Sequence, residues 1–161
     1  MKIPQGITVR VDGQKVTVKG PAGEVSKTFA KTTSVRSDAG GIDVESKDPA
    51  LKGTAEAVLR AMFHGAGSGY TKSMKLLHAH FPISMEIKGS EITIKNFLGE
   101  KQPRKTVLVG STKVQAKGQS VTITGPDKEA VGQTLANIRQ AMRIRDKDGR
   151  VFQDGIYDAE Q

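Results

Sequence analysis

Apolar and polar residues alternate along two similar stretches of the chain, residues 7–24 and residues 83–100. A period of two is typical of β-strands that bury one face, because successive side chains point to opposite sides of a sheet. A short polar segment with a glycine interrupts each stretch, Gly13 in the first and Gly89 in the second. Glycine readily adopts the positive φ that a tight two-residue turn requires. Both stretches are therefore predicted to form β-hairpins.

The two stretches align at a constant offset of 76 residues, which indicates an internal repeat. Both copies end in Gly-Glu, and apolar residues match apolar residues throughout. Farther along, residues 38–44 resemble residues 116–123, and both segments are predicted to form a second hairpin. We infer a duplicated module of about 75 to 80 residues, a size that buries only a modest core.

A helix is predicted to follow the strands in each copy, within residues 53–62 and residues 132–142. Apolar residues recur four positions apart in both, as in Ile138 and Met142, so each pair shares one helix face. An adjacent aspartate and proline precede each helix and are predicted to mark its start, because the carboxylate accepts hydrogen bonds from free N–H groups. We predict that Arg143 lies in the last turn of the second helix, where a cation suits the helix dipole.

These elements predict an α+β fold of two duplicated modules, each an antiparallel β-sheet covered by one α-helix. We place the N-terminal module at residues 1–74 and the C-terminal module at residues 75–161. Since duplicated modules share a scaffold, the segments in which the copies differ are the better candidates for function.

The charge balance favours a polyanionic partner. The chain carries 25 Lys and Arg against 17 Asp and Glu, a formal net charge of +8. Nucleic acid and anionic membrane both fit this balance. Aromatic residues make up only 4% of the chain and tryptophan is absent. Because single-stranded RNA is usually bound by stacking its bases on exposed rings, folded RNA recognised by backbone and shape is the better match.

Several classes of protein are excluded or disfavoured by composition. The absence of cysteine rules out disulfides, a thiolate zinc site and a cysteine nucleophile. No apolar run approaches the roughly 20 residues that cross a bilayer. The first five residues lack the apolar core of a signal peptide. We therefore expect a cytoplasmic protein.

Two basic segments are peculiar to the second copy. Residues 95–105 hold four basic residues and one acid, with Gly99 and Pro103 restraining the loop. Residues 143–157 follow the second helix, and their cations alternate with Asp146 and Asp148. A solvated loop is the ordinary explanation for such a charge run. Phosphate binding is the alternative, and it gains support because both segments belong to the same copy.

Two features of the sequence suggest catalysis or metal binding, but neither matches the pattern that such a site requires. Residues 64–73 resemble a phosphate loop, but Lys72 follows a threonine instead of a glycine, and a helix instead of a strand precedes them. We predict a helix end there. His78 and His80 are predicted to share a strand face, yet zinc sites usually need three or four ligands. No metal site, cofactor or enzymatic activity is predicted.

A peripheral membrane or acidic-protein adaptor is a competing hypothesis from a different class. It would require an amphipathic helix with a basic face. The helix expected within residues 132–142 carries little charge, which favours the RNA hypothesis.

Several motifs together resemble one family. They are His-Phe-Pro at residues 80–82, Asn-Phe-Leu-Gly-Glu-Lys at residues 96–101, Pro-Arg at residues 103–104, Glu-Ala-Val-Gly-Gln-Thr at residues 129–134 and Arg-Val-Phe-Gln-Asp-Gly-Ile-Tyr at residues 150–157. With the repeat, they resemble the sixth large-subunit ribosomal protein family, in its archaeal and eukaryotic branch. The resemblance covers essentially the whole chain.

The resemblance implies a structural constituent of the large ribosomal subunit, found in the cytoplasm, that binds 23S-type rRNA mainly through its second module. It further implies a position near the sarcin–ricin loop, close to where translation factors dock and to ribosomal proteins of the stalk base. For Phe97 and Phe152, ring contacts with RNA are one alternative, and packing in the core is the favoured one. The RNA-facing candidates that the resemblance implies are Lys95, Lys101, Arg104, Lys105, Arg143, Arg145, Lys147 and Arg150.

Overall fold

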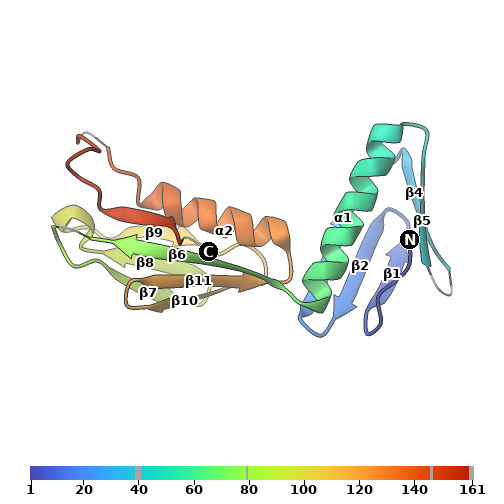
Figure 1. The fold of residues 1–161 in the computed structure, drawn as a ribbon, viewed down its shortest axis with the longest axis horizontal. Helices are drawn as coiled ribbons and strands as arrows, with labels where there is room; N and C mark the ends of the chain where they lie inside the picture. The colour runs from blue at the N-terminus through green and yellow to red at the C-terminus, as the bar shows by residue number, and fades with distance from the viewer. Residues whose placement is uncertain (39–40, 79, 146, 160–161) are drawn as a thin grey trace. The chain divides into compact units, whose positions relative to one another are not determined.

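The structure is a computed structural model that describes residues 1–38, 41–78, 80–145 and 147–159 (Figure 1). The chain divides into two compact units. Unit 1 comprises Met1–Tyr70 with Gly125–Lys128, and unit 2 comprises Thr71–Thr124 with Glu129–Gln161. Each unit combines antiparallel strands with one long helix, so the predicted α+β fold of two modules is confirmed. The predicted module limits, residues 1–74 and 75–161, stay a prediction.

Unit 1 contains two separate groups of strands. A three-stranded sheet has the order β1-β2-β3, and β4 pairs with β5 in a two-stranded sheet. Asp12 pairs with Lys15, which leaves Gly13 at the turn with a φ of +64°, as the first predicted hairpin requires. Ala39 and Gly40, the expected turn of the second hairpin, lie outside the described residues. The strands are β1 (Thr8–Asp12), β2 (Lys15–Gly20), β3 (Gly23–Thr28), β4 (Thr33–Asp38) and β5 (Gly41–Ser46).

Helix α1 (Pro49–Gly67) covers the strands of unit 1. Asp48 caps it by accepting a hydrogen bond of 2.9 Å from the Ala50 backbone N–H, which confirms the predicted start. The helix ends at Gly67, and Gly69 has a φ of +76° just before the next strand. Residues 64–73 therefore form a helix end, a turn and the beginning of the next strand, in place of a phosphate loop. The core between helix and strands is apolar, with Val16, Val18, Ile42, Leu59, Met62 and Ala66 buried.

Unit 2 also divides its strands between two sheets. One has the order β7-β8-β9 and the other the order β10-β11-β6-β12. Gly89 has a φ of +61° between Lys88 and Glu91, which pair, so the hairpin predicted in the second copy is confirmed. The strands are β6 (Tyr70–Leu77), β7 (Ser84–Lys88), β8 (Glu91–Lys95), β9 (Arg104–Val107), β10 (Lys113–Lys117), β11 (Ser120–Gly125) and β12 (Gly155–Asp158).

The helix of unit 2, α2 (Lys128–Ala141), begins directly after Asp127. It buries Val131, Thr134 and Ile138, and the strands contribute Ile92, Ile94 and Ile123 to the buried residues of this unit. Its end corrects one prediction, because Arg143 follows the helix instead of lying in its last turn. The Arg143 backbone N–H donates to Gln140 O three residues earlier, which tightens the chain beyond Ala141.

The structure corrects the predicted position of the two histidines and shows a strand near the end of the chain. Strand β6 ends at Leu77, so His78 and His80 lie beyond the strand that was expected to carry both; Ala79 between them lies outside the described residues. A solvated loop was the ordinary explanation for the charges in residues 143–157, yet this segment ends in a strand: β12 pairs antiparallel with β6, Ile156 opposite Leu76. In the described part of the chain, neither helix has the length and apolar character to span a bilayer.

Candidate nucleic-acid interface

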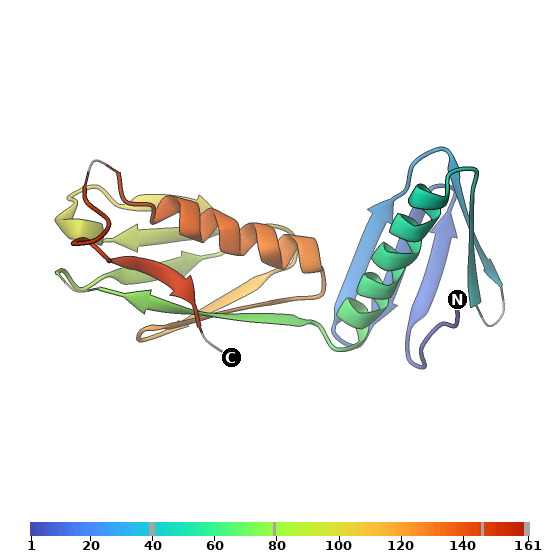
Figure 2. The ribbon, with the colours of Figure 1, turned by 45° about the horizontal axis from the view of Figure 1, so that its top comes forward.

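Both basic segments of the second copy lie at the same end of unit 2. Figures 1 and 2 show the short 3₁₀ helix η1 (Phe97–Gly99) and the segment between α2 and β12 at this end in both views. Direct hydrogen bonds connect the segments. Arg104 Nη1 donates to Arg143 O over 2.9 Å, which joins the β8–β9 connection to the residues that follow α2. We call this end of unit 2 the basic end.

A buried ring fixes the β8–β9 connection. Phe97 is only 1% exposed, which confirms that it packs in the core. On either side of it, Asn96 and Leu98 have φ values of +60° and +51°, a left-handed conformation that non-glycine residues rarely adopt. The Asn96 side-chain amide donates to Pro82 O over 3.0 Å. Burial of the ring and this hydrogen bond offset the backbone strain and hold the loop in one shape.

Arg104 uses its donors within the protein. Its Nε donates to Glu100 Oε2 over 2.8 Å, and its Nη2 donates to Glu100 Oε1 over 2.5 Å. Its Nη1 donates to Ala141 O and Arg143 O, at 2.8 and 2.9 Å. The guanidinium also lies over the Phe97 ring, 4.4 Å from its centroid. Hydrogen bonding to Arg104 lowers the pKa of Glu100, which favours the ionised carboxylate.

Lys95 and Lys105 each face a glutamate on the β7-β8-β9 sheet. Lys95 Nζ lies 2.5 Å from Glu86 Oε1, and Lys105 Nζ lies 2.8 Å from Glu91 Oε1. The hydrogen bond from Lys95 lowers the pKa of Glu86, and the bond to Glu91 raises the pKa of Lys105. Both pairs are solvent-exposed and therefore weak. A phosphate can replace the carboxylate, but only by displacing it.

The other five candidates are exposed. Arg150 has 93% of its side chain exposed, with its Nε 3.5 Å from Asp148 Oδ1. Lys147 Nζ lies 4.8 Å from the centroid of the Phe152 ring. Arg145 lines a small hollow together with Arg104, Gln140 and Ala141. Asp146 lies outside the described residues. We call these five the exposed cations: Lys101, Arg143, Arg145, Lys147 and Arg150.

A histidine anchors the segment that follows α2. The His80 ring stacks on Phe152 at a centroid distance of 5.0 Å, and its Nδ1 lies 3.1 Å from Asp154 Oδ1. Asp154 is 1% exposed. The sequence favours a structural or exposed role for His80 over metal binding, but it does not reveal these partners, which lie more than 70 residues away. Phe152 is half-buried. Its ring packs against the His80 ring and contacts Lys147 Nζ.

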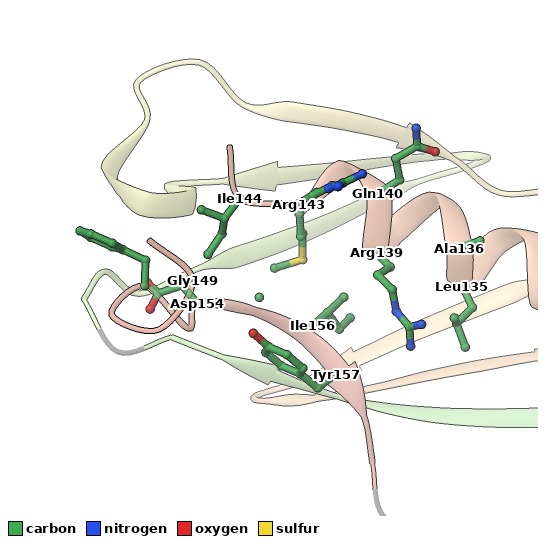
Figure 3. A pocket seen from close by; sticks show the side chains of 13 residues that line it. Leu135, Ala136, Arg139, Gln140, Arg143, Ile144, Gly149, Asp154, Ile156 and Tyr157 are labelled. Carbon is green, nitrogen blue, oxygen red and sulfur yellow. The ribbon is translucent and has the colours of Figure 1, made fainter. Parts of the chain in front are cut away.

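A groove of about 600 Å³ runs between α2 and the C-terminal segment (Figure 3). Leu135, Met142 and Ile156 contribute apolar walls. Arg139 and Arg143 project from the helix side and Tyr157 from the strand side. Arg139 pairs with Asp158 over 2.8 Å, and Tyr157 donates to Gln153 O over 3.1 Å. Cations at one edge of an apolar groove suit binding of an anionic partner more than acid–base catalysis.

The fold and the basic end define a class of protein: a duplicated α+β protein whose clustered, exposed cations are suited to binding folded RNA. Comparison with known proteins identifies the family. The model of the family described as Ribosomal protein L6 matches residues 81–155. The chain belongs to the ribosomal protein L6 family, whose members are structural constituents of ribosomes and not enzymes.

Relatives match nearly the whole chain. A protein from Methanocella arvoryzae named large ribosomal subunit protein uL6 is 46% identical, covering 98% of this chain and 93% of the relative. Proteins of the same name from Methanobrevibacter smithii and Haloarcula marismortui are 43% and 40% identical, each covering 98% of this chain and 92% of the relative. The resemblance found from the sequence motifs is therefore confirmed.

Proposed function

We propose that this chain is a structural constituent of the large ribosomal subunit and that its basic end binds structured large-subunit rRNA. One observation carries this proposal: hydrogen bonds hold the two basic segments that distinguish the second copy at one end of one unit. A fixed arrangement of cations loses less entropy when it engages a folded polyanion. Membership of a ribosomal protein family supports the choice of rRNA as that polyanion.

The eight candidate cations contribute in different ways under this proposal. The exposed cations engage phosphates directly, because their side chains are solvent-exposed and the ion pair of Arg150 with Asp148 is itself exposed and therefore weak. Lys95 and Lys105 engage phosphates only after exchanging a glutamate partner. Aromatic stacking contributes little, since Phe97 is buried and Phe152 packs against His80. Recognition therefore depends on backbone shape, with little reading of bases.

The proposed location is near the sarcin–ricin loop, beside the docking site of translation factors and the ribosomal proteins of the stalk base. This location rests on the family resemblance, and the chain acts there without a cofactor, in cytoplasmic ribosomes. The competing adaptor hypothesis gains no support from α2. Its residues are mostly uncharged, and Arg139 pairs with Asp158.

Single-cysteine variants test the location, because the natural chain has no cysteine to compete. A tethered iron chelate at Lys101→Cys and at Lys147→Cys should cleave neighbouring nucleotides of the same rRNA region, next to the sarcin–ricin loop. Arg10→Cys in β1 serves as the control from unit 1. Cleavage by both basic-end variants at unrelated places, or at no place above the control, would refute the proposed location.

Glu86→Gln tests whether Lys95 engages RNA. The substitution removes the carboxylate that competes for Lys95 Nζ. We expect rRNA binding to tighten by roughly a few-fold at moderate salt and to become more salt-dependent by about one contact. Glu45→Gln, an exposed position in β5, makes the same change in net charge and is the matched control. Equal effects of the two substitutions in a filter-binding salt series would show that Lys95 is no ligand.

A further inference from the structure

Arg104 differs from the other candidate cations in how its side chain is used. Its three nitrogens make four hydrogen bonds within the chain, two to one carboxylate and two to backbone carbonyls. Its side chain is 26% exposed, whereas that of Arg150 is 93% exposed. To bind a phosphate in the same bidentate way, it would have to release either Glu100 or the end of α2.

We propose that Arg104 is a positioning residue that fixes the exposed cations on either side of it relative to one another, and that it does not itself bind phosphate. This inference rests on the proposed function of the basic end. On one side, Arg104 holds the loop that carries Lys101, through Glu100 and the Phe97 ring. On the other side, it holds the chain that carries Arg143 and Arg145, through the two carbonyls.

The contacts at the end of α2 explain why an arginine is needed. The last carbonyls of a helix have no partner within the helix, and a cation there also interacts favourably with the helix dipole. Nη1 reaches both Ala141 O and Arg143 O, while Nε and Nη2 grip the two oxygens of Glu100. A planar guanidinium can do both at once, whereas the ammonium group of lysine lacks this fork.

The contacts of Arg104 should make the two basic segments bind RNA cooperatively. Segments almost 40 residues apart in sequence present their cations at a fixed separation, so binding of one segment to RNA places the other near its phosphates. Loosening Arg104 removes this coupling but none of the exposed cations. We therefore expect affinity to fall while the number of released counterions, and hence the salt dependence, stays unchanged.

Two substitutions distinguish this role from direct phosphate binding. Arg104→Lys keeps the charge and loses the fork; Glu100→Gln makes the chain more positive and weakens the grip on Arg104. If Arg104 positions other residues, both should weaken rRNA binding roughly tenfold with the salt slope of the natural chain. If Arg104 binds phosphate, Glu100→Gln should bind more tightly, because it frees the guanidinium, and Arg104→Lys should keep a phosphate contact without its bidentate geometry.

The experiment measures binding of the full chain and these variants to large-subunit rRNA across a salt series, with circular dichroism to verify folding. Amide hydrogen exchange in the free chain is the second readout, and residues 141–145 should lose protection in both variants. Lys101→Ala is the control: its salt slope should fall by about one, with exchange at residues 141–145 unchanged. The double variant Glu100→Gln/Arg104→Lys should lose no more affinity than either single variant, because both break one unit.

Natural affinity in Arg104→Lys, or tighter binding by Glu100→Gln, would overturn the positioning role and leave the proposed function standing. A natural chain that shows no preference for large-subunit rRNA would overturn the proposed function, and the RNA role of Arg104 with it. Exchange at residues 141–145 would then still report whether Arg104 holds the end of α2.

Discussion

Replacing four of the exposed cations together with glutamine should weaken rRNA binding by roughly a hundredfold or more at moderate salt. Each basic side chain next to a phosphate releases about one condensed counterion, so the slope of log affinity against log salt should fall by about three to four. Since these side chains are exposed, the fold should be unaffected. Filter binding across a salt series measures both effects. The four are Arg143, Arg145, Lys147 and Arg150.

A matched variant separates local binding from net charge. It carries glutamine at four exposed lysines of unit 1, namely Lys15, Lys19, Lys31 and Lys47, and thus has the same net charge as the first. We expect it to retain most of the affinity for rRNA and most of the salt slope. Equal losses in the two variants would mean that the chain binds RNA through its overall charge, and the basic end would lose its special role.

Phe97→Ala should cost about 3–5 kcal/mol of stability, the range found for removing a fully buried ring. The loss falls on a module whose core is modest, so it is a large part of the total. The ring also supports Arg104 and the left-handed residues Asn96 and Leu98. RNA affinity should therefore fall together with stability, which urea unfolding and binding measure separately.

Phe97→Leu is the control for this substitution, because it preserves an apolar side chain in the cavity while removing the flat ring beneath Arg104. We expect a smaller loss of stability, about 1–2 kcal/mol. A natural stability for Phe97→Ala would contradict the role of the ring as the anchor of the loop.

Much of the fold follows from local sequence patterns. The hairpins of both copies were predictable because alternation defines strand faces, and Gly13 and Gly89 define the turns between them. The pairing of β12 with β6 was not predictable in this way. Its partners, Ile156 and Leu76, are far apart in the chain, and neither alternation nor turn chemistry specifies which distant strands pair. The division of each unit into two sheets escaped prediction for the same reason.

The candidate site was predictable as a set of segments but not as an arrangement. The local clustering of Lys and Arg in the sequence identified both basic segments. The internal hydrogen bonds of Arg104 could not be found in this way, because they depend on the end of α2, which is distant in sequence. The pairing of Lys95 with Glu86 did have a signal. A two-residue turn at Gly89 sets the register of β7 with β8, and it places both side chains near each other on one sheet face.

His80 illustrates the remaining difficulty. A histidine next to another histidine invites a search for metal ligands nearby in sequence. Its contacts with Phe152 and Asp154 instead connect the start of the second copy with the end of the chain. Only the tertiary fold brings these residues together.

The most direct test of rRNA recognition by the basic end compares two RNAs. One is a large-subunit rRNA fragment that contains the sarcin–ricin region, the other is an unrelated RNA duplex of equal length, and the full chain is titrated with each. Both titrations should cover the same salt series, since the affinity of a basic protein for RNA depends steeply on the salt concentration. We predict clear preference for the rRNA fragment, lost when the four exposed cations Arg143, Arg145, Lys147 and Arg150 become glutamine. Equal, weak binding to both RNAs would contradict the claim that the basic end recognises structured rRNA.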